Sequence, residues 1–113
     1  MNLQRGEIIL VNLSPTKGSE QDKTRPALVI QNDIGNQYSP TTIIVPFTSS
    51  YTEPYPTDVE VLADESCLEK DSVAQCNQIR TVSIQHRIQN KLGTLPNKKM
   101  EQVNRAIKIS LGL

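Results

Sequence analysis

Gly18-Ser19-Glu20-Gln21-Asp22-Lys23-Thr24-Arg25-Pro26 is a polar segment that runs directly into the apolar stretch Ala27-Leu28-Val29-Ile30. Pro26 fixes its own φ and disfavours the helical region for the preceding residue, so we expect Arg25 to be held extended at the mouth of a strand. A planar, permanently charged guanidinium in a fixed position suits a phosphate or a carboxylate. The alternative is an ordinary surface loop that closes a hairpin, with Arg25 solvated or paired to Glu20.

Outward from this segment, the chain has mostly the period of strands. Apolar or alternating residues predict strands at 7–13, 26–31, 42–47, 58–62, 72–82 and 88–92. The prolines and tyrosines of 49–57 predict a long loop. In the tail, apolar residues recur every three or four positions between Pro96 and Gly112, which predicts a helix. We therefore expect one mainly β domain over residues 1–113, a small, strongly curved antiparallel barrel or sheet with a C-terminal helix.

The composition of the chain bears on three classes of function: polyanion binding, membrane association and zinc binding. Twelve basic and twelve acidic residues leave no net charge, so a polyanion would have to be held by a local patch. The sequence shows neither an apolar run near the roughly 20 residues that span a bilayer nor a signal-peptide core, so we expect a cytoplasmic protein without membrane contact. Cys67 and Cys76 lack a C-x-x-C spacing and a histidine partner, which argues against zinc; reduced thiols are favoured over a disulfide.

The polar residues near predicted strand ends are the candidates for chemistry. Thr48 and Ser49 follow Pro46-Phe47, where a hydroxyl could face a groove or simply cap a turn. Gln78 and Arg80 stand two apart on the predicted strand 72–82, so they could line a groove together or form a solvated face.

His86, the only histidine, lies in a polar segment and is predicted to be an exposed loop residue, not a general base. The sequence carries no nucleophile elbow, phosphate-cradling glycine loop or metal cluster. If the catalytic side chains are Arg, Glu, Thr and Ser, they can supply positive charge and hydrogen-bond donors to a phosphate transition state. Such a reaction takes its nucleophile from the substrate. The 2′-hydroxyl of RNA is such a nucleophile.

An ordered set of motifs resembles the MazF/PemK/Kid toxins of bacterial toxin–antitoxin systems, over essentially the whole chain. These motifs are Arg5-Gly6-Glu7-Ile8, Pro15-Thr16-Lys17-Gly18-Ser19-Glu20-Gln21, Thr24-Arg25-Pro26-Ala27-Leu28-Val29-Ile30, Asn32-Asp33, Pro46-Phe47-Thr48, Asp71-Ser72-Val73, Gln78-Ile79-Arg80-Thr81 and Ile109-Ser110-Leu111-Gly112-Leu113.

The resemblance implies a homodimeric SH3-like barrel that cuts single-stranded mRNA at a short sequence without a metal or other cofactor. It implies an antitoxin partner, for which we expect an acidic, partly disordered tail. Arg25 and Thr48 match the family's catalytic arginine and threonine, and Glu20 matches an acidic residue implicated in activity. Products would carry a 2′,3′-cyclic phosphate and a 5′-hydroxyl. The predicted RNA-binding residues are Ser19, Gln21, Thr24, Ser49, Gln78 and Arg80.

Some positions depart from the family pattern. Asp22-Lys23 stands where relatives often have small residues, and Cys76-Asn77 replaces an aliphatic and an acidic residue. Tyr51 and Tyr55 could stack on bases or pack their own loop. A rival function is a module that binds protein, such as a gyrase poison or a peptide-binding barrel, since fold does not settle function. Such a module would not need the pair Arg25 and Thr48.

Overall fold

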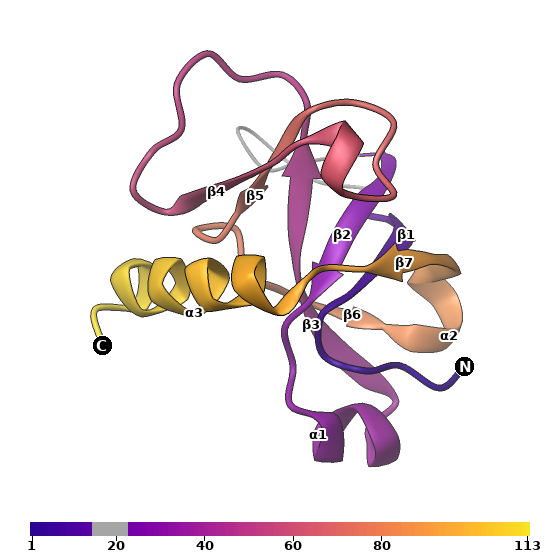
Figure 1. The fold of residues 1–113 in the computed structure, drawn as a ribbon. Helices are drawn as coiled ribbons and strands as arrows, with labels where there is room; N and C mark the ends of the chain where they lie inside the picture. Colours follow the sequence, from indigo (N-terminus) through magenta and orange to yellow (C-terminus); the bar gives the residue numbers. More distant parts are fainter. Residues whose placement is uncertain (15–22) are drawn as a thin grey trace.

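The computed structural model describes residues 1–14 and 23–113. The described chain forms a curved sheet with one long helix across it (Figure 1). The strands are β1 (Glu7–Asn12), β2 (Thr24–Val29), β3 (Thr41–Thr48), β4 (Asp58–Val61), β5 (Ser72–Gln75), β6 (Arg80–Ser83) and β7 (Ile88–Thr94). The helices are α1 (Asp33–Tyr38), the 3-10 turn η1 (Ala63–Glu65), α2 (Ile84–Arg87) and α3 (Asn97–Leu111).

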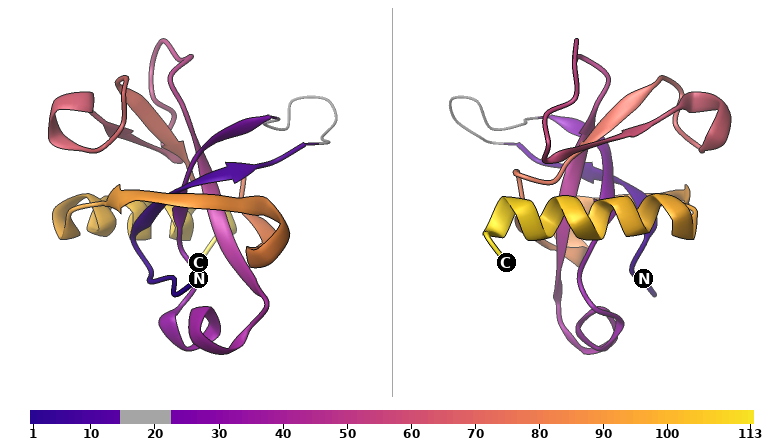
Figure 2. Two further views of the ribbon diagram at one scale, coloured as in Figure 1. Left: turned by 90° about the vertical axis from the view of Figure 1, so that its right-hand side faces the viewer. Right: turned by 60° about the vertical axis from the view of Figure 1, so that its left-hand side comes forward.

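The sheet is antiparallel throughout and is organised around β3. The strand order is β4-β5-β3-β2-β1-β7, and β6 also pairs with β3. The first residues of β3 pair with β6, its middle with β2 and its last residues with β5. A strand that changes partner along its length must bend, and two further views show the resulting curvature (Figure 2). Among the described residues the path ends at β4 and β7, so the fold is barrel-like but open. The predicted mainly β fold with a C-terminal helix is confirmed.

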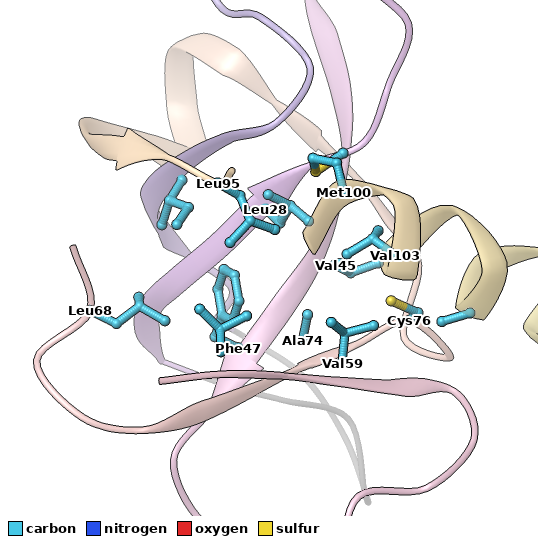
Figure 3. Packing of buried hydrophobic residues seen from close by; sticks show 13 residues of the cluster. Leu28, Val45, Phe47, Val59, Leu68, Ala74, Cys76, Leu95, Met100 and Val103 are labelled. Carbon is cyan, nitrogen blue, oxygen red and sulfur yellow. The ribbon is translucent and has the colours of Figure 1, made fainter. Parts of the chain in front are cut away.

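Two apolar clusters sandwich β1, β2 and β3. Alternate residues of these strands enter opposite clusters, as the pleat requires. Leu28 and Val45 belong to the first cluster, whereas their neighbours Val29 and Ile44 belong to the second. Burial on both faces explains why the second half of β2, Ala27–Val29, is continuously apolar. Helix α3 covers the first cluster with side chains that include Met100 and Val103 (Figure 3).

The predicted tail helix is confirmed. Pro96 is its N-cap, where the missing N–H is no loss, and α3 runs from Asn97 to Leu111. Gly112 ends it in the left-handed conformation with φ 73°, and its N–H donates to the carbonyls of Ile109 and Lys108. Within the described residues, no helix combines the length and apolar character needed to cross a membrane.

The single predicted strand at 72–82 is wrong, because the chain turns inside it. The N–H of Gln78 donates to the carbonyl of Gln75 at 3.0 Å, which separates β5 from β6. The two halves then pair with opposite ends of β3. Gln78 therefore precedes β6 and does not share a strand face with Arg80.

The short helices α1 and α2 and the 3-10 turn η1 were not predicted. Asn32 caps α1, since its side chain accepts from the N–H of Gly35 at 2.8 Å. Ser83 caps α2 in the same way by accepting from the N–H of His86. His86 is exposed, as predicted, but lies in α2 and not in a loop.

Candidate active site

Arg25 and Thr48 are neighbours across two strands. The β2–β3 ladder ends where Ala27 lies opposite Pro46, so Arg25 and Thr48 each lie two residues beyond its last pair, on adjacent strands. Both side chains line the same cleft. Consistent with this, the Nη1 of Arg25 donates to the carbonyl of Phe47 at 3.4 Å. This hydrogen bond places the guanidinium beside the end of β3.

Both residues line a cleft of about 520 Å³, here called the Arg25 cleft. Its lining is mostly apolar, and the charged residues in it are Arg25, Lys70 and Glu69. A cleft of this composition can bind an anion next to an apolar group. Its lining residues are Leu10, Arg25, Pro26, Phe47, Thr48, Ser49, Ser50, Cys67, Leu68, Glu69, Lys70, Ser72 and Leu92.

A second cleft, of about 660 Å³, adjoins the first and is here called the Gln78 cleft. It is lined by Thr48, Ser49, Ser50, Tyr51, Thr52, Glu53, Tyr55, Asp58, Val73, Gln75, Asn77 and Gln78. Residues 48–50 line both clefts. Thr48 therefore stands where the two clefts meet.

The environment of Thr48 leaves its hydroxyl proton available to a ligand. The side chain is buried, with 8% of its surface exposed, and its Oγ1 accepts from the N–H of Ser50 at 3.2 Å. A hydroxyl that accepts in one direction can still donate in another. The sequence left open whether this hydroxyl faces a groove or caps a turn. Thr48 does both, since it caps the turn after β3 and lines both clefts.

The structure brings only part of the predicted site together. Arg25, Thr48, Ser49 and Gln78 line the two clefts. Thr24 is exposed and lines neither, and Arg80 instead donates from Nη1 to the carbonyl of Leu13 at 2.8 Å. The predicted residues Ser19, Glu20 and Gln21 lie outside the described part of the chain.

The two tyrosines of the predicted loop line the Gln78 cleft in different ways. The hydroxyl of Tyr51 donates to Oε2 of Glu60 at 2.8 Å. This hydrogen bond, with burial and the negative charge of Glu60, raises the pKa of Tyr51 to about 12, so the phenol stays protonated at neutral pH. The side chain of Tyr55 is 73% exposed, so its ring is accessible from solvent.

Comparisons with known proteins identify the family of this chain. The family model for the PemK-like, MazF-like toxin of type II toxin–antitoxin systems matches residues 4–111. The chain belongs to this family. A curated relative, the endoribonuclease MazF of Staphylococcus saprophyticus subsp. saprophyticus, is 47% identical over 112 residues, covering 98% of this chain and 92% of that protein.

Solved structures show the same fold. MazF from Deinococcus radiodurans superposes with a TM-score of 0.84 at 23% identity, over 100% of this chain and 99% of that one. An endoribonuclease from a mycobacterial species, solved in complex with its cognate antitoxin, gives 0.81 at 22% identity, over 98% and 96% of the two chains.

Sequence reasoning missed several cleft residues of this PemK/MazF family member. Lys70 and Glu69 line the Arg25 cleft, but in the sequence a charged pair before a strand gives no signal beyond that of a solvated loop. Cys67 and Cys76 are not joined by a disulfide, and burial raises the pKa of the Cys76 thiol to about 12. Within the described residues, no group of three or more His, Cys, Asp or Glu side chains is placed to hold a metal ion.

Proposed function

We propose that this chain is the toxin of a type II toxin–antitoxin pair, an endoribonuclease that cleaves single-stranded mRNA at a short sequence. The observation that carries the proposal is the placement of Arg25 beside Thr48 where two clefts meet. Membership of the PemK/MazF family and the identity to an endoribonuclease support it. A single domain carries this function, and we expect it to act in the cytoplasm, where its mRNA substrate is.

The proposed reaction uses the nucleophile of the substrate. The RNA 2′-oxygen attacks the adjacent phosphorus and loses its proton, while the bond to the 5′-oxygen breaks and that oxygen takes up a proton. The fragments carry a 2′,3′-cyclic phosphate and a 5′-hydroxyl.

Arg25 stabilises the negative charge that grows on the pentavalent phosphate, and Thr48 donates to a phosphate oxygen or orients the 2′-hydroxyl. Because arginine holds its proton at neutral pH, we assign Arg25 charge stabilisation and not proton transfer. Glu20 stays a predicted third member.

The two clefts supply room for the bases on either side of the scissile phosphate. With the phosphate at Thr48, one neighbouring nucleotide enters the apolar Arg25 cleft and the other enters the polar Gln78 cleft. The amide of Gln78 and the hydroxyl of Ser49 can hydrogen-bond to base edges, and the exposed ring of Tyr55 can stack. Of the other RNA-binding residues predicted from sequence, Ser19 and Gln21 stay predictions, whereas Thr24 and Arg80 line neither cleft.

Digestion of a long single-stranded RNA in EDTA tests the proposal. We expect discrete fragments with 2′,3′-cyclic phosphate ends, and primer extension across them identifies the sequence that is cut. Protein with Arg25→Ala, purified in parallel, controls for contaminating ribonuclease. Intact RNA together with arrested gyrase supercoiling would instead support the rival class, a toxin that acts by binding protein.

We further propose that an antitoxin with an acidic, disordered tail inhibits the toxin by covering residues 19–25 and the Arg25 cleft. The cations of that cleft suit a segment that folds on binding. We expect the bound antitoxin to slow hydrogen exchange in residues 19–25 and to abolish cleavage. Complete inhibition without slower exchange there would locate the inhibitory contact elsewhere.

We also propose that the active form is a homodimer. Apolar side chains at the end of α3 are exposed, with Ile109 at 58%, Leu111 at 57% and Leu113 at 86%. Closed two-fold dimers are the commonest way to bury such surface. Sedimentation at micromolar concentration should report a dimer. A monomer that cuts RNA at the full rate would contradict a shared RNA path.

A further inference from the structure

Two arginines bind the backbone at the end of β1. The Nη1 of Arg80 donates to the carbonyl of Leu13 at 2.8 Å. The Nη1 of Arg87 donates to the carbonyl of Asn12 at 3.4 Å and also to the carbonyl of Ser14. Three successive carbonyls of β1 and its continuation are therefore held by guanidinium groups from β6 and α2.

The topology explains how residues so distant in sequence meet. Strand β7 runs beside β1 (Figure 1). Ile88 lies opposite Val11 in their ladder, so Arg87 comes beside Asn12. Arg80 lies opposite Ile44, whose side chain packs in the same buried cluster as Leu13. Arg80 thus reaches the end of β1 from β6, and Arg87 reaches it from the last residue of α2, directly before β7.

The end of β1 in turn determines where β2 begins. Val11 pairs with Arg25, and Asn12 pairs with Thr24. Past the ladder, the N–H of Leu13 donates to the carbonyl of Lys23 at 3.0 Å. Lys23 has φ 69°, a left-handed conformation that non-glycine residues adopt only when their surroundings enforce it. The position of the Arg25 backbone is therefore coupled to the carbonyls that the two arginines hold.

We infer that Arg80 and Arg87 are positioning residues, which hold the β1–β2 end so that Arg25 faces Thr48, and that they are not phosphate ligands. The inference rests on the proposed ribonuclease activity. It differs from the sequence prediction, in which Arg80 contacts RNA. Arg80 and Arg87 line neither the Arg25 cleft nor the Gln78 cleft. Small displacements of a catalytic group, on the order of 1 Å, can lower a rate by about a hundredfold.

Steady-state kinetics separate positioning from phosphate binding. For Arg80→Ala and Arg87→Ala we expect kcat to fall about tenfold, with KM and the salt dependence of RNA binding unchanged. A phosphate ligand would behave differently: KM would rise, and the slope of log affinity against log salt would become shallower by about 0.7. Arg105→Ala is the matched control, because Arg105 is exposed on α3 and lines neither cleft.

Citrulline in place of Arg80 removes the charge and keeps an N–H donor at the end of the side chain. Such a chain can be made by ligating residues 1–75, as a thioester, to a synthetic peptide 76–113 that begins with Cys76. If Arg80 positions β1, the citrulline protein should keep a kcat within about threefold of wild type, whereas the kcat of Arg80→Ala falls further. If citrulline raises KM and weakens the salt dependence as alanine does, the inference is wrong for Arg80.

Hydrogen exchange gives a readout that needs no RNA. The amide of Leu13 should exchange faster in Arg80→Ala and Arg87→Ala than in wild type or Arg105→Ala. Unchanged Leu13 exchange in folded variants would overturn the inference even if activity fell. Should Arg80→Ala fail to fold, Arg87→Ala and the citrulline chain carry the test. If wild type does not cut RNA, the proposed function fails, while the exchange of Leu13 still decides whether the two arginines hold β1.

Discussion

Arg25→Ala is expected to lower the rate of RNA cleavage by about a hundredfold or more while the protein stays folded. Loss of one preorganised donor aimed at a developing oxyanion typically has an effect of this size. Folding should survive because Arg25 is only half-buried at the start of β2, and the apolar residues that follow it carry the core contacts. Arg25→Lys should recover part of the rate, since an ammonium keeps the charge but not the planar pair of donors.

The measurement is single-turnover cleavage of a short oligonucleotide that contains the cut sequence, with circular dichroism to check the fold. Single-turnover rates isolate chemistry from product release. Wild-type rates in a folded Arg25→Ala protein would remove Arg25 from the catalytic machinery and leave the two clefts without an assigned reaction.

Thr48→Val is expected to lower the cleavage rate about a hundredfold, whereas Thr48→Ser stays within a few-fold of wild type. Valine has nearly the shape of threonine but cannot donate to a phosphate oxygen, and serine keeps the hydroxyl. Valine also removes the acceptor for the N–H of Ser50, so we expect a stability loss of about 1 kcal/mol. Thermal unfolding separates this loss from the kinetic effect.

His86→Ala is the control for this experiment. His86 is exposed on α2 and lines neither cleft, so its removal should leave the rate close to wild type. A large loss in His86→Ala would mean that proton transfer depends on imidazole. An active Thr48→Val protein would reduce Thr48 to its role in capping the turn after β3.

The core strands and the pair at the site were predictable because their signals are local. Pro26 restricts Arg25 directly, and the apolar stretch behind it can only be a buried strand or a short buried helix. Pro96 and Gly112 mark the ends of α3 for equally local reasons, a missing N–H and a left-handed φ. The motif resemblance assigns Arg25 and Thr48 to one reaction, and the antiparallel pairing of β2 with β3 brings the two residues to one cleft.

What the sequence did not reveal depends on contacts between distant segments. Apolar and polar residues alternate through 72–82, so the sequence alone predicts one strand. The chain turns at Gln78 because β5 and β6 pair with opposite ends of β3. The contact of Arg80 with Leu13 has no local signature, so a guanidinium near a predicted groove was interpreted as a phosphate ligand. Helix α1 has only six residues, too few for a period to show.

The difference in burial between Thr48 and the residues that follow it affects how the cleavage specificity of this toxin can change. Thr48 is buried at the end of β3, yet the Gln78 cleft beside it is walled largely by exposed side chains of 49–55. Mutations in that wall can accumulate at little expense to folding and without moving the chemical pair. We therefore expect that new cleavage sequences can be reached by short mutational paths, and a library randomised over 51–55 would be a practical starting point for retargeting the nuclease.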